Sequence, residues 1–508
     1  FDIKKIGTYA RNILDPTQPE TNAVRIEMPQ APKTLGGEEF GDTDAMMDTP
    51  GITNPVVFVA KHEDVSHVIS AQKKDGKALF SVSPYMEAGN RLLRGGNLLI
   101  GTEAGGPTEE ARTRLTDILE AAWGFLYANG DLRNRLETIT KKSINRALQN
   151  SAATGQIDLV DDIATNTVYE IVSKIFGTPG PDWLTELAVS LPFARQHIGQ
   201  IYPDWLSIFE GKERPANPGC RTMQIWSAFL FLDIVGNVPQ TKELKALGGQ
   251  SSAEMLSHFD ALIHAASQDV PIPVPSPDGG PPSFKNRKNG DPITLLDSFL
   301  LIAPTICQRY KYSKDAYLAD VRGLLLEVVG SPMTIIPANF ASIMEAVFQM
   351  RLDLPSLVPM LEQPPKFESA DTAQNKMSGL HRFIYETTRI NPTVKLLVRE
   401  CMADTKLPGG ADLEKGDWVT SIMGAANLDF TVFPSSQEFS LGPYDNGPAR
   451  PYDKYLLFGA EGGERQCWGK DKIALYILEN CIRGASKLDG LSALAGPKGE
   501  VYEPFRIA

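Results

Sequence analysis

Cys467 is the residue whose type and surroundings most strongly indicate chemistry. It lies in the segment LLFGAEGGERQCWGKDKIALYILENCIRG (456–484), between a glycine-rich loop and an amphipathic helix. The apolar positions of that helix are Ile473, Ile477, Leu478, Cys481 and Ile482. A cysteine just before a helix meets unpaired backbone N–H groups and the positive end of the helix dipole. Both features lower the pKa of the thiol, so the segment predicts a stabilised thiolate at Cys467.

The residues around Cys467 suggest a flat cofactor. Gly463 and Gly469 let the backbone fold tightly around the sulfur, as close approach of such a cofactor requires. Arg465 is placed to reach a carboxylate of the cofactor. A buried structural cysteine in a turn is the alternative interpretation. A phosphate-binding loop is excluded, because Gly469-Lys470 is followed by Asp471 instead of Ser or Thr.

The string GERQCWG resembles the haem-binding signature of cytochrome P450, G-x-R-x-C-x-G, at Gly463, Arg465, Cys467 and Gly469. The resemblance implies that the Cys467 thiolate is the axial ligand of the iron of haem b. Phe458 lies nine residues before the cysteine, whereas the family usually has this Phe seven residues before it. The loop is therefore expected to be two residues longer than the common pattern.

A second element of the family precedes the cysteine loop, in YETTRINP. Glu386 and Arg389 form an E-x-x-R pair on one helix face, and the resemblance implies a structural role behind the haem. Alone the pair is not specific, since Glu109 and Arg112 also fit it. The resemblance further implies that Arg399, Arg465 and Arg112 hold the haem propionates. The segment 416–439 resembles the family's meander; its usual Arg is missing, and Arg450 is a substitute.

The central helix departs from the oxygen-activating pattern A-G-x-D/E-T-T. The chain has Val329-Gly330-Ser331-Pro332-Met333-Thr334, so that Pro332 replaces the acid and Met333 the first Thr. In the family the acid and the alcohol deliver protons to bound oxygen. The alternative interpretation is a monooxygenase that varies this motif and recruits water.

Several strings are most similar to the group of allene oxide synthase, hydroperoxide lyase, divinyl ether synthase and epoxyalcohol synthase, which needs no proton relay. RQCWGKD resembles the group's K-Q-C-A-G-K-D, and GSPMTIIP keeps its spacing from glycine to proline. Where the group has an Asn near the hydroperoxide, this chain has Glu327. Glu327 is expected either to contact the hydroperoxide or, alternatively, to face away or pair with Arg322.

The resemblance implies a haem-thiolate enzyme that rearranges a polyunsaturated fatty-acid hydroperoxide to an allene oxide or an epoxyalcohol. Homolytic cleavage of the O–O bond would need no dioxygen, reductant or reductase, and a fused or separate dioxygenase would supply the hydroperoxide. Glu327 and Thr334 are expected near the reacting oxygen. Two alternatives stay open: a monooxygenase or peroxygenase that hydroxylates a lipid or natural product, and a haem protein that senses a ligand without turnover.

Composition excludes other classes of protein. The 508 residues include 50 Lys and Arg against 62 Asp and Glu, a net charge of −12, and 42% are hydrophobic. This balance excludes global disorder and does not favour nucleic-acid binding. The five cysteines are scattered, which argues against a disulfide framework or a zinc site. Apolar runs such as AFLFLDIVG (228–236) are too short to span a membrane. We expect a soluble chain, cytoplasmic or peripherally membrane-associated. Because it begins at Phe1 without Met, we interpret it as trimmed or as part of a longer polypeptide.

Local patterns predict a mainly helical protein with a smaller β part. The resemblance implies the cytochrome P450 fold, a triangular helical prism around a buried haem. Strands are expected at 23–29 and 55–60. Helices are expected from 107 and over 158–180, 182–198, 221–236, 252–267, 293–309 and 315–350, the last one interrupted by Pro332 and Pro337. The Pro-rich stretch 268–292 is interpreted as an internal loop, so 1–508 is expected to be one haem-thiolate domain.

Overall fold

The computed structural model of the chain describes most of the residues between 55 and 491. The described ranges are 24–26, 55–70, 73–74, 77–93, 97–102, 108–184, 217–235, 242–268, 273–274, 283–284, 292–362, 378–434, 438–441, 454–459, 465–488 and 491. The α-helices are α3 (His62–Ile69), α4 (Ser83–Leu92), α5 (Glu109–Asn129), α6 (Leu132–Thr154), α7 (Asn166–Ile171), α10 (Pro218–Val235), α11 (Lys242–Gln268), α12 (Leu295–Tyr310), α13 (Lys314–Gln349), α14 (Leu354–Glu362), α15 (Gly379–Ile390), α16 (Met423–Ala426) and α17 (Leu475–Ala485). π-Helical turns are η1 (Leu159–Thr165), η2 (Val172–Phe176) and η6 (Lys470–Ala474).

The strands are short and belong to one larger sheet and three small hairpins. They are β1 (Val24–Ile26), β2 (Val56–Val59), β3 (Lys73–Lys74), β4 (Lys77–Ala78), β5 (Phe80–Ser81), β6 (Pro273–Val274), β7 (Ser283–Phe284), β8 (Leu396–Cys401), β9 (Thr405–Lys406), β10 (Asp412–Leu413) and β11 (Trp418–Ile422). The larger sheet has the order β1-β2-β11-β8-β5. Only the pair of β2 and β11 is parallel, with Val57 opposite Val419.

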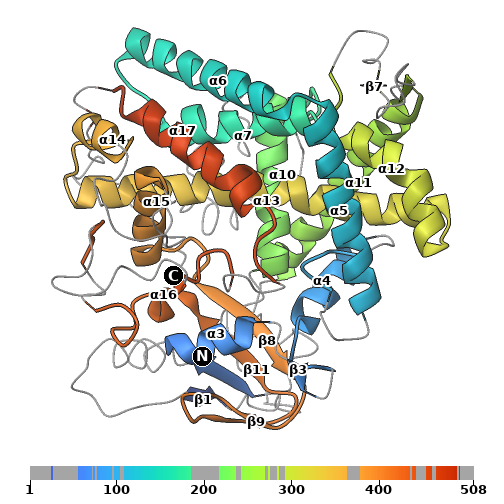
Figure 1. The fold of residues 1–508 in the computed structure, drawn as a ribbon, viewed down its shortest axis with the longest axis vertical. Coiled ribbons are helices and arrows are strands. Elements are labelled where there is room, and N and C mark those ends of the chain that lie inside the picture. Colours follow the sequence, from blue (N-terminus) through green and yellow to red (C-terminus); the bar gives the residue numbers. More distant parts are fainter. Residues whose placement is uncertain are drawn as a thin grey trace, which may run out of the picture.

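Helices and sheet occupy different parts of the molecule. In Figure 1 the labelled strands of the larger sheet gather at the lower end with α3 and α16 beside them, most other helices lie above, and α13 crosses the helical part. α13 packs against α5, α7, α10, α11, α12, α15, α17 and η1. The main apolar cluster is centred on this helix, with Val321, Leu325, Val329 and Phe340 fully or almost fully buried. A mainly helical chain with a small sheet is therefore confirmed.

Capping residues explain where three of the central helices begin. The Thr294 hydroxyl and the Asp297 carboxylate form a reciprocal capping box at the start of α12. The Ser313 hydroxyl accepts from the Ala316 N–H at the start of α13, and the Ser378 hydroxyl from the His381 N–H at the start of α15. These side chains satisfy N–H groups that have no partner inside the helix.

The sequence-based expectations for single elements are confirmed in most described positions. The predicted strand at 55–60 is β2, and the helix expected from 107 is α5. The helical stretch over 158–180 is built from η1, α7 and η2 and ends at Gly177, whose φ of 77° is easiest for glycine. α11 begins earlier than the expected 252, at Lys242. The expected helix at 182–198 lies almost entirely outside the described residues.

The expected interruption of the central helix is wrong. α13 is one continuous helix of 36 residues that contains both Pro332 and Pro337. A proline removes one N–H and crowds the preceding turn, but buried neighbours can hold the helix together. Met333, Ile336 and Pro337 itself are buried and supply that packing.

Two further expectations need qualification. Within the Pro-rich stretch 268–292 the described strands β6 and β7 pair as a short antiparallel hairpin, with Pro273 opposite Phe284. Among the described helices, α13 is long and apolar enough to cross a membrane, although the sequence contains no uninterrupted apolar run of that length. Because 67% of its most apolar window is buried inside the protein, α13 fits a central core helix.

Candidate active site

Cys467 lies three residues before η6, which continues into α17. Its own N–H donates to the carbonyl of Phe458 at 2.7 Å, so the lengthened loop closes between its first and last residues. Gly459, which directly follows Phe458, has a φ of 88°, and a Cβ there would lie 3.0 Å from the carbonyl oxygen of Arg465. Gly459 is therefore a glycine that this turn requires, which the sequence analysis did not single out.

The two glycines chosen from the sequence have different outcomes. Gly469 has an ordinary φ of −80°, and a Cβ there would meet no atom within 4 Å. Whether Gly469 permits close approach of a flat cofactor therefore stays a prediction. Gly463 lies outside the described residues.

The Cys467 thiol is held in a desolvated place. Burial raises its pKa, while hydrogen bonds from the backbone N–H groups of Gly469 and Lys470 and the Lys470 ammonium act in the opposite direction. The expected net lowering of the thiol pKa is therefore wrong in this structure, because desolvation outweighs the helix N-terminus. A bound metal ion would add the missing positive charge, since the metal-binding form of cysteine is the thiolate.

Cys467 nevertheless has exposed surface. Desolvation nonetheless raises its pKa, so protein surrounds part of the thiol.

The middle of α13 shows the same property on one face. Glu327, Thr334, Ile335 and Ala338 are half-buried and Ser331 is exposed, in a helix whose other faces are mostly buried. The spacing of 327, 331, 334, 335 and 338 places these residues along one side of the helix. This side is therefore the least covered part of the middle of α13.

The alcohol on that face is engaged with its own helix. The Thr334 hydroxyl donates to the Gly330 carbonyl at 3.1 Å, which leaves its lone pairs directed away from the backbone. Ser331 is the other alcohol on this side. No carboxylate among the described residues hydrogen-bonds either hydroxyl.

Two of the arginines predicted to hold propionates lie at adjacent strands of the sheet. Arg465 donates from Nη2 to the carbonyl of Phe80 in β5, at 3.0 Å. Arg399 lies in β8, which pairs with β5, and its guanidinium carbon lies 5.3 Å from the ring centroid of Tyr85. The structure thereby brings residues far apart in the sequence to one edge of the sheet.

Arg399 is a buried cation without a carboxylate. Only 6% of the residue is exposed, Nη1 donates to the Val398 carbonyl at 2.7 Å, and Nε has no hydrogen-bond partner among the described residues. A buried guanidinium in this state is costly unless an anion completes it. The Cys467 thiol with its two backbone N–H donors and this buried guanidinium fit a flat, metal-bearing group with carboxylates, such as haem.

Glu386 and Arg389 form a fully buried pair on α15. Arg389 donates from Nε and Nη2 to the two carboxylate oxygens of Glu386, at 3.0 and 2.8 Å. It also donates to the carbonyl of Asn427, while the Tyr455 hydroxyl donates to Glu386 at 2.7 Å. The pair therefore connects α15 to the segment that leads to the cysteine loop, and its role toward a haem stays a prediction.

Glu327 does not pair with Arg322, which instead contacts Asp260. The two carboxylate oxygens of Glu327 accept hydrogen bonds from the backbone N–H groups of Leu99 and Ile100, at 2.9 and 2.8 Å. Burial raises its pKa to about 7, opposed by these two hydrogen bonds and by the charge of Arg112. Whether Glu327 also acts on a substrate stays a prediction.

Arg112, the third predicted propionate ligand, lies on α5 beside Glu327. Its Nη1 is 3.3 Å from the Leu99 carbonyl and 3.4 Å from the Thr102 carbonyl. The structure thus places Arg112 against residues 99–102, apart from the strand edge that Arg399 and Arg465 share.

Sequence reasoning missed the residues that flank the cysteine from outside. The Trp468 indole N–H donates to Glu120 at 2.7 Å, Trp123 packs edge-on against Trp468, and the Lys472 ammonium lies 4.1 Å from the Trp468 ring centroid. Trp468 directly follows Cys467, but no signal in the sequence indicated that Glu120 and Trp123 on α5 would meet it.

Comparison with known proteins supports the same assignment. Residues 366–478, which include the Glu386–Arg389 pair and Cys467, match the family model described as Cytochrome P450. The chain is similar to Cytochrome P450 714C2 of Oryza sativa subsp. japonica, with 33% identity over 20% of this chain and 21% of the relative. It is also similar to Geissoschizine oxidase of Catharanthus roseus, with 34% identity over 18% of this chain and 19% of the relative. The match thus spans about a fifth of the length of these curated relatives.

The likeness of the fold extends much further than the likeness of the sequence. The crystal structure of CalO2 matches 87% of this chain and 85% of its own, with a TM-score of 0.55 and 17% identity. This match shows the fold, which is that of cytochrome P450 haem domains, and the predicted fold is confirmed. The match of residues 366–478 supports the resemblance to the cytochrome P450 superfamily, whereas the comparisons do not support a closer similarity to the allene oxide synthase group.

Proposed function

We propose that this member of the cytochrome P450 superfamily is a haem-thiolate oxidase that acts on an apolar natural product or lipid by the monooxygenase-type chemistry of its relatives. The single observation that carries the proposal is Cys467, a thiol that is exposed on one side and accepts two backbone N–H groups just before a helix. The similarity to Geissoschizine oxidase and to Cytochrome P450 714C2 favours oxidation over rearrangement.

The cofactor would be haem b, held by residues that the structure places at one end of the sheet and beside α17. Cys467 would bind the iron through Sγ, and Arg399 and Arg465 would hold the propionates near β5, with Arg112 a further candidate. When bound, the haem would supply activation of an oxygen species beside a thiolate ligand. The N–H groups of Gly469 and Lys470 would stabilise the charge on Sγ.

The substrate would lie against the half-buried face of α13. Ile335 and Ala338 give this face an apolar part, and Ser331 and Thr334 give it two hydroxyls. Such a wall would orient an apolar molecule by contact and a polar group by one hydrogen bond, and it would exclude bulk water.

A second function, rearrangement of a fatty-acid hydroperoxide, is favoured by one specific observation. Pro332 stands where a proton-delivering acid is expected, and the Glu327 carboxylate is already engaged by Leu99 and Ile100. A substrate that brings its own O–O bond would not need that acid. In this case no reductase would be required, and a fused or separate dioxygenase would supply the hydroperoxide.

One paired experiment separates these functions. The purified haem-loaded chain is given, in air, apolar substrates with NADPH and a surrogate reductase, and separately, without air or reductant, a polyunsaturated fatty-acid hydroperoxide. Oxygenated product in the first arm alone supports the oxidase. Rapid loss of the conjugated diene in the second arm alone supports the rearrangement enzyme. Inactivity in both arms would contradict both and leave a haem protein that binds a ligand without turnover.

A further inference from the structure

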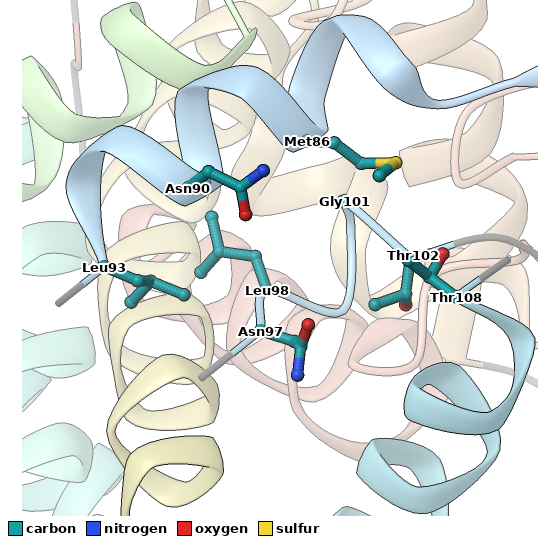
Figure 2. A pocket seen from close by; sticks show the side chains of 9 residues that line it. Met86, Asn90, Leu93, Asn97, Leu98, Gly101, Thr102 and Thr108 are labelled. Carbon is teal, nitrogen blue, oxygen red and sulfur yellow. The ribbon is translucent and has the colours of Figure 1, made fainter. Parts of the chain in front are cut away.

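Residues 97–102 lie as a short segment between α4 and α13. On one side the Leu98 side chain comes 3.2 Å from where a Cβ on Gly89 of α4 would lie, and Gly101 approaches the backbone of Tyr85 and Met86. Figure 2 shows the pocket of about 30 Å³ on this side, with Leu98 and Asn97 beneath α4 and Thr102 at the far end. This pocket is too small for more than about one water, so the outer side of the segment is packed.

The other side of the segment is bound to α13 at three positions along one helix face. The Asn97 side-chain amide donates to Asp320 at 3.2 Å. The Asn97 carbonyl lies 2.3 Å from where a Cβ on Gly323 would be, so the backbones touch there. Glu327 then accepts the N–H groups of Leu99 and Ile100. Positions 320, 323 and 327 follow each other at helical spacing, so the segment runs along α13.

Glu327 is the strongest of these three contacts. A carboxylate that accepts two backbone N–H groups forms two charge-assisted bonds, whereas the Asn97–Asp320 bond is single and Gly323 gives only close contact. Burying a carboxylate costs free energy unless hydrogen bonds compensate for the lost hydration, and the two N–H groups supply such bonds here. Arg112 on α5 donates to the Leu99 and Thr102 carbonyls, so the segment is hydrogen-bonded to α5 as well as to α13.

We infer that Glu327 is a positioning residue: its carboxylate fixes residues 97–102 against α13 and so sets one wall of the chamber that the proposed function requires beside Ser331, Thr334, Ile335 and Ala338. The inference deepens the proposed function. It rests on that function in one respect, which is that the chamber is a substrate site. In this account Glu327 acts through Leu99 and Ile100 and not by giving a proton to the substrate.

The first test is hydrogen–deuterium exchange of the amides in 97–102 in the full haem-loaded chain. Glu327→Leu removes both acceptors, and we expect the Leu99 and Ile100 amides to exchange at least about tenfold faster than in the wild type. Glu327→Gln keeps one acceptor and places an NH2 group against the other N–H, so one of the two amides should lose protection. Wild-type exchange of both amides in both variants would overturn the inference.

Glu345→Gln is the matched control. Glu345 also lies on α13 and also accepts two hydrogen bonds, but from the side chains of Gln349 and Asn391. Its replacement should leave exchange in 97–102 unchanged; acceleration there as large as in Glu327→Gln would show a general loosening of α13 and overturn the specific role. If Glu327→Leu does not fold, Glu327→Gln and this control decide the test.

The second test concerns the wall itself and uses two probes that bind haem iron. 4-Phenylimidazole carries a phenyl ring that would extend from the iron toward the proposed wall, whereas imidazole carries none. We expect Glu327→Gln to raise the dissociation rate constant of 4-phenylimidazole severalfold and to leave that of imidazole unchanged. An unchanged rate constant for 4-phenylimidazole would overturn the assignment of 97–102 to the wall.

Neither readout requires turnover, so the inference and the proposed function fail separately. A chain that binds haem but oxidises no substrate would contradict the proposed function and leave these results intact. A chain that binds no haem would also contradict the proposed function, and the exchange experiment on it would still decide whether Glu327 fixes the segment.

Discussion

Arg389 and Glu386 are buried and form hydrogen bonds with residues from later parts of the chain. Arg389 donates to Glu386 and to the Asn427 and Glu438 carbonyls, while Glu386 also accepts from Tyr455 and from the Ser440 N–H. Neither residue has exposed side-chain surface. Breaking a buried pair by removing one charge leaves the other uncompensated, which is more costly than the pair itself is favourable.

We therefore predict that Glu386→Gln lowers the free energy of unfolding by about 3–5 kcal/mol, measured by denaturant titration. The control is Glu109→Gln, which breaks the exposed contact with Lys73 and should cost at most about 1 kcal/mol. Equal, small effects of the two variants would contradict the structural role of the Glu386–Arg389 pair.

Arg399 allows a prediction about cofactor retention. If its buried guanidinium holds a propionate, Arg399→Gln removes one charged hydrogen-bond donor, and haem should leave roughly tenfold to a hundredfold faster. The rate is measured by transfer of haem to apomyoglobin. Arg322→Gln, which removes the contact with Asp260 outside the chamber, is the control and should release haem at the wild-type rate. Equal release rates in both variants would remove Arg399 from the haem site.

Glu327 allows a prediction about pH. Its folded-state pKa of about 7 lies above its ordinary value of 4.5, so the folded chain binds more protons between these pH values. Its contribution to the free energy of unfolding is therefore present below about pH 4.5 and is lost as pH rises through 7. Among the described residues, the charge that acts on the pKa of Glu327 is that of Arg112. The charged groups Asp161 on η1 and Arg221 on α10, two elements that pack against α13, contact each other.

The measurement compares wild type with Glu327→Gln by denaturant titration from pH 5 to pH 8. The wild type should gain stability relative to the variant as pH falls, because the charged form is the one that burial penalises. The hydrogen bonds from Leu99 and Ile100 weaken as pH falls, because the protonated carboxyl of Glu327 has fewer acceptor sites, and they partly offset this gain. A stability difference that does not change with pH would contradict the raised pKa.

At the scale of elements, α13 and the segment 97–102 fit each other at Gly323. A Cβ there would lie 2.3 Å from the Asn97 carbonyl, which belongs to the backbone and cannot turn away. We predict that Gly323→Ala lowers the free energy of unfolding and displaces 97–102, seen as faster amide exchange in that segment.

Gly124→Ala is the matched control on α5. A Cβ at Gly124 meets no atom within 4 Å, so alanine should raise the free energy of unfolding by about 0.5–1 kcal/mol through helix propensity. Stabilisation by Gly323→Ala as well would contradict the close approach of the two backbones.

Elements were predictable where a local pattern determines them. Periodic apolar residues gave α5, α10, α12 and α13, and the E-x-x-R spacing placed Glu386 and Arg389 on one helix face. The continuity of α13 through Pro332 and Pro337 was not predictable, because it depends on packing of neighbours from other helices. The π-helical turns η1, η2 and η6 have no simple sequence signal either.

At the scale of the whole molecule, the candidate site combines segments that are distant in sequence. The thiol comes from Cys467, Arg465 donates to the carbonyl of Phe80 in β5, and Glu327 accepts the backbone N–H groups of Leu99 and Ile100. Backbone N–H groups occur at almost every residue, so no pattern in the sequence could identify Leu99 and Ile100 as partners. Cys467 was identifiable because its neighbours along the chain carry the signature.

The account therefore depends most on the bond between Cys467 and haem iron. The most direct measurement is the absorbance spectrum of the reduced, carbon monoxide-bound protein for wild type, Cys467→Ser and Cys307→Ser. Cys307 is a free, half-buried thiol on α12 and serves as the control. We predict the long-wavelength Soret band of a thiolate ligand in wild type and Cys307→Ser and its loss in Cys467→Ser. Retention of that band in Cys467→Ser would contradict the account.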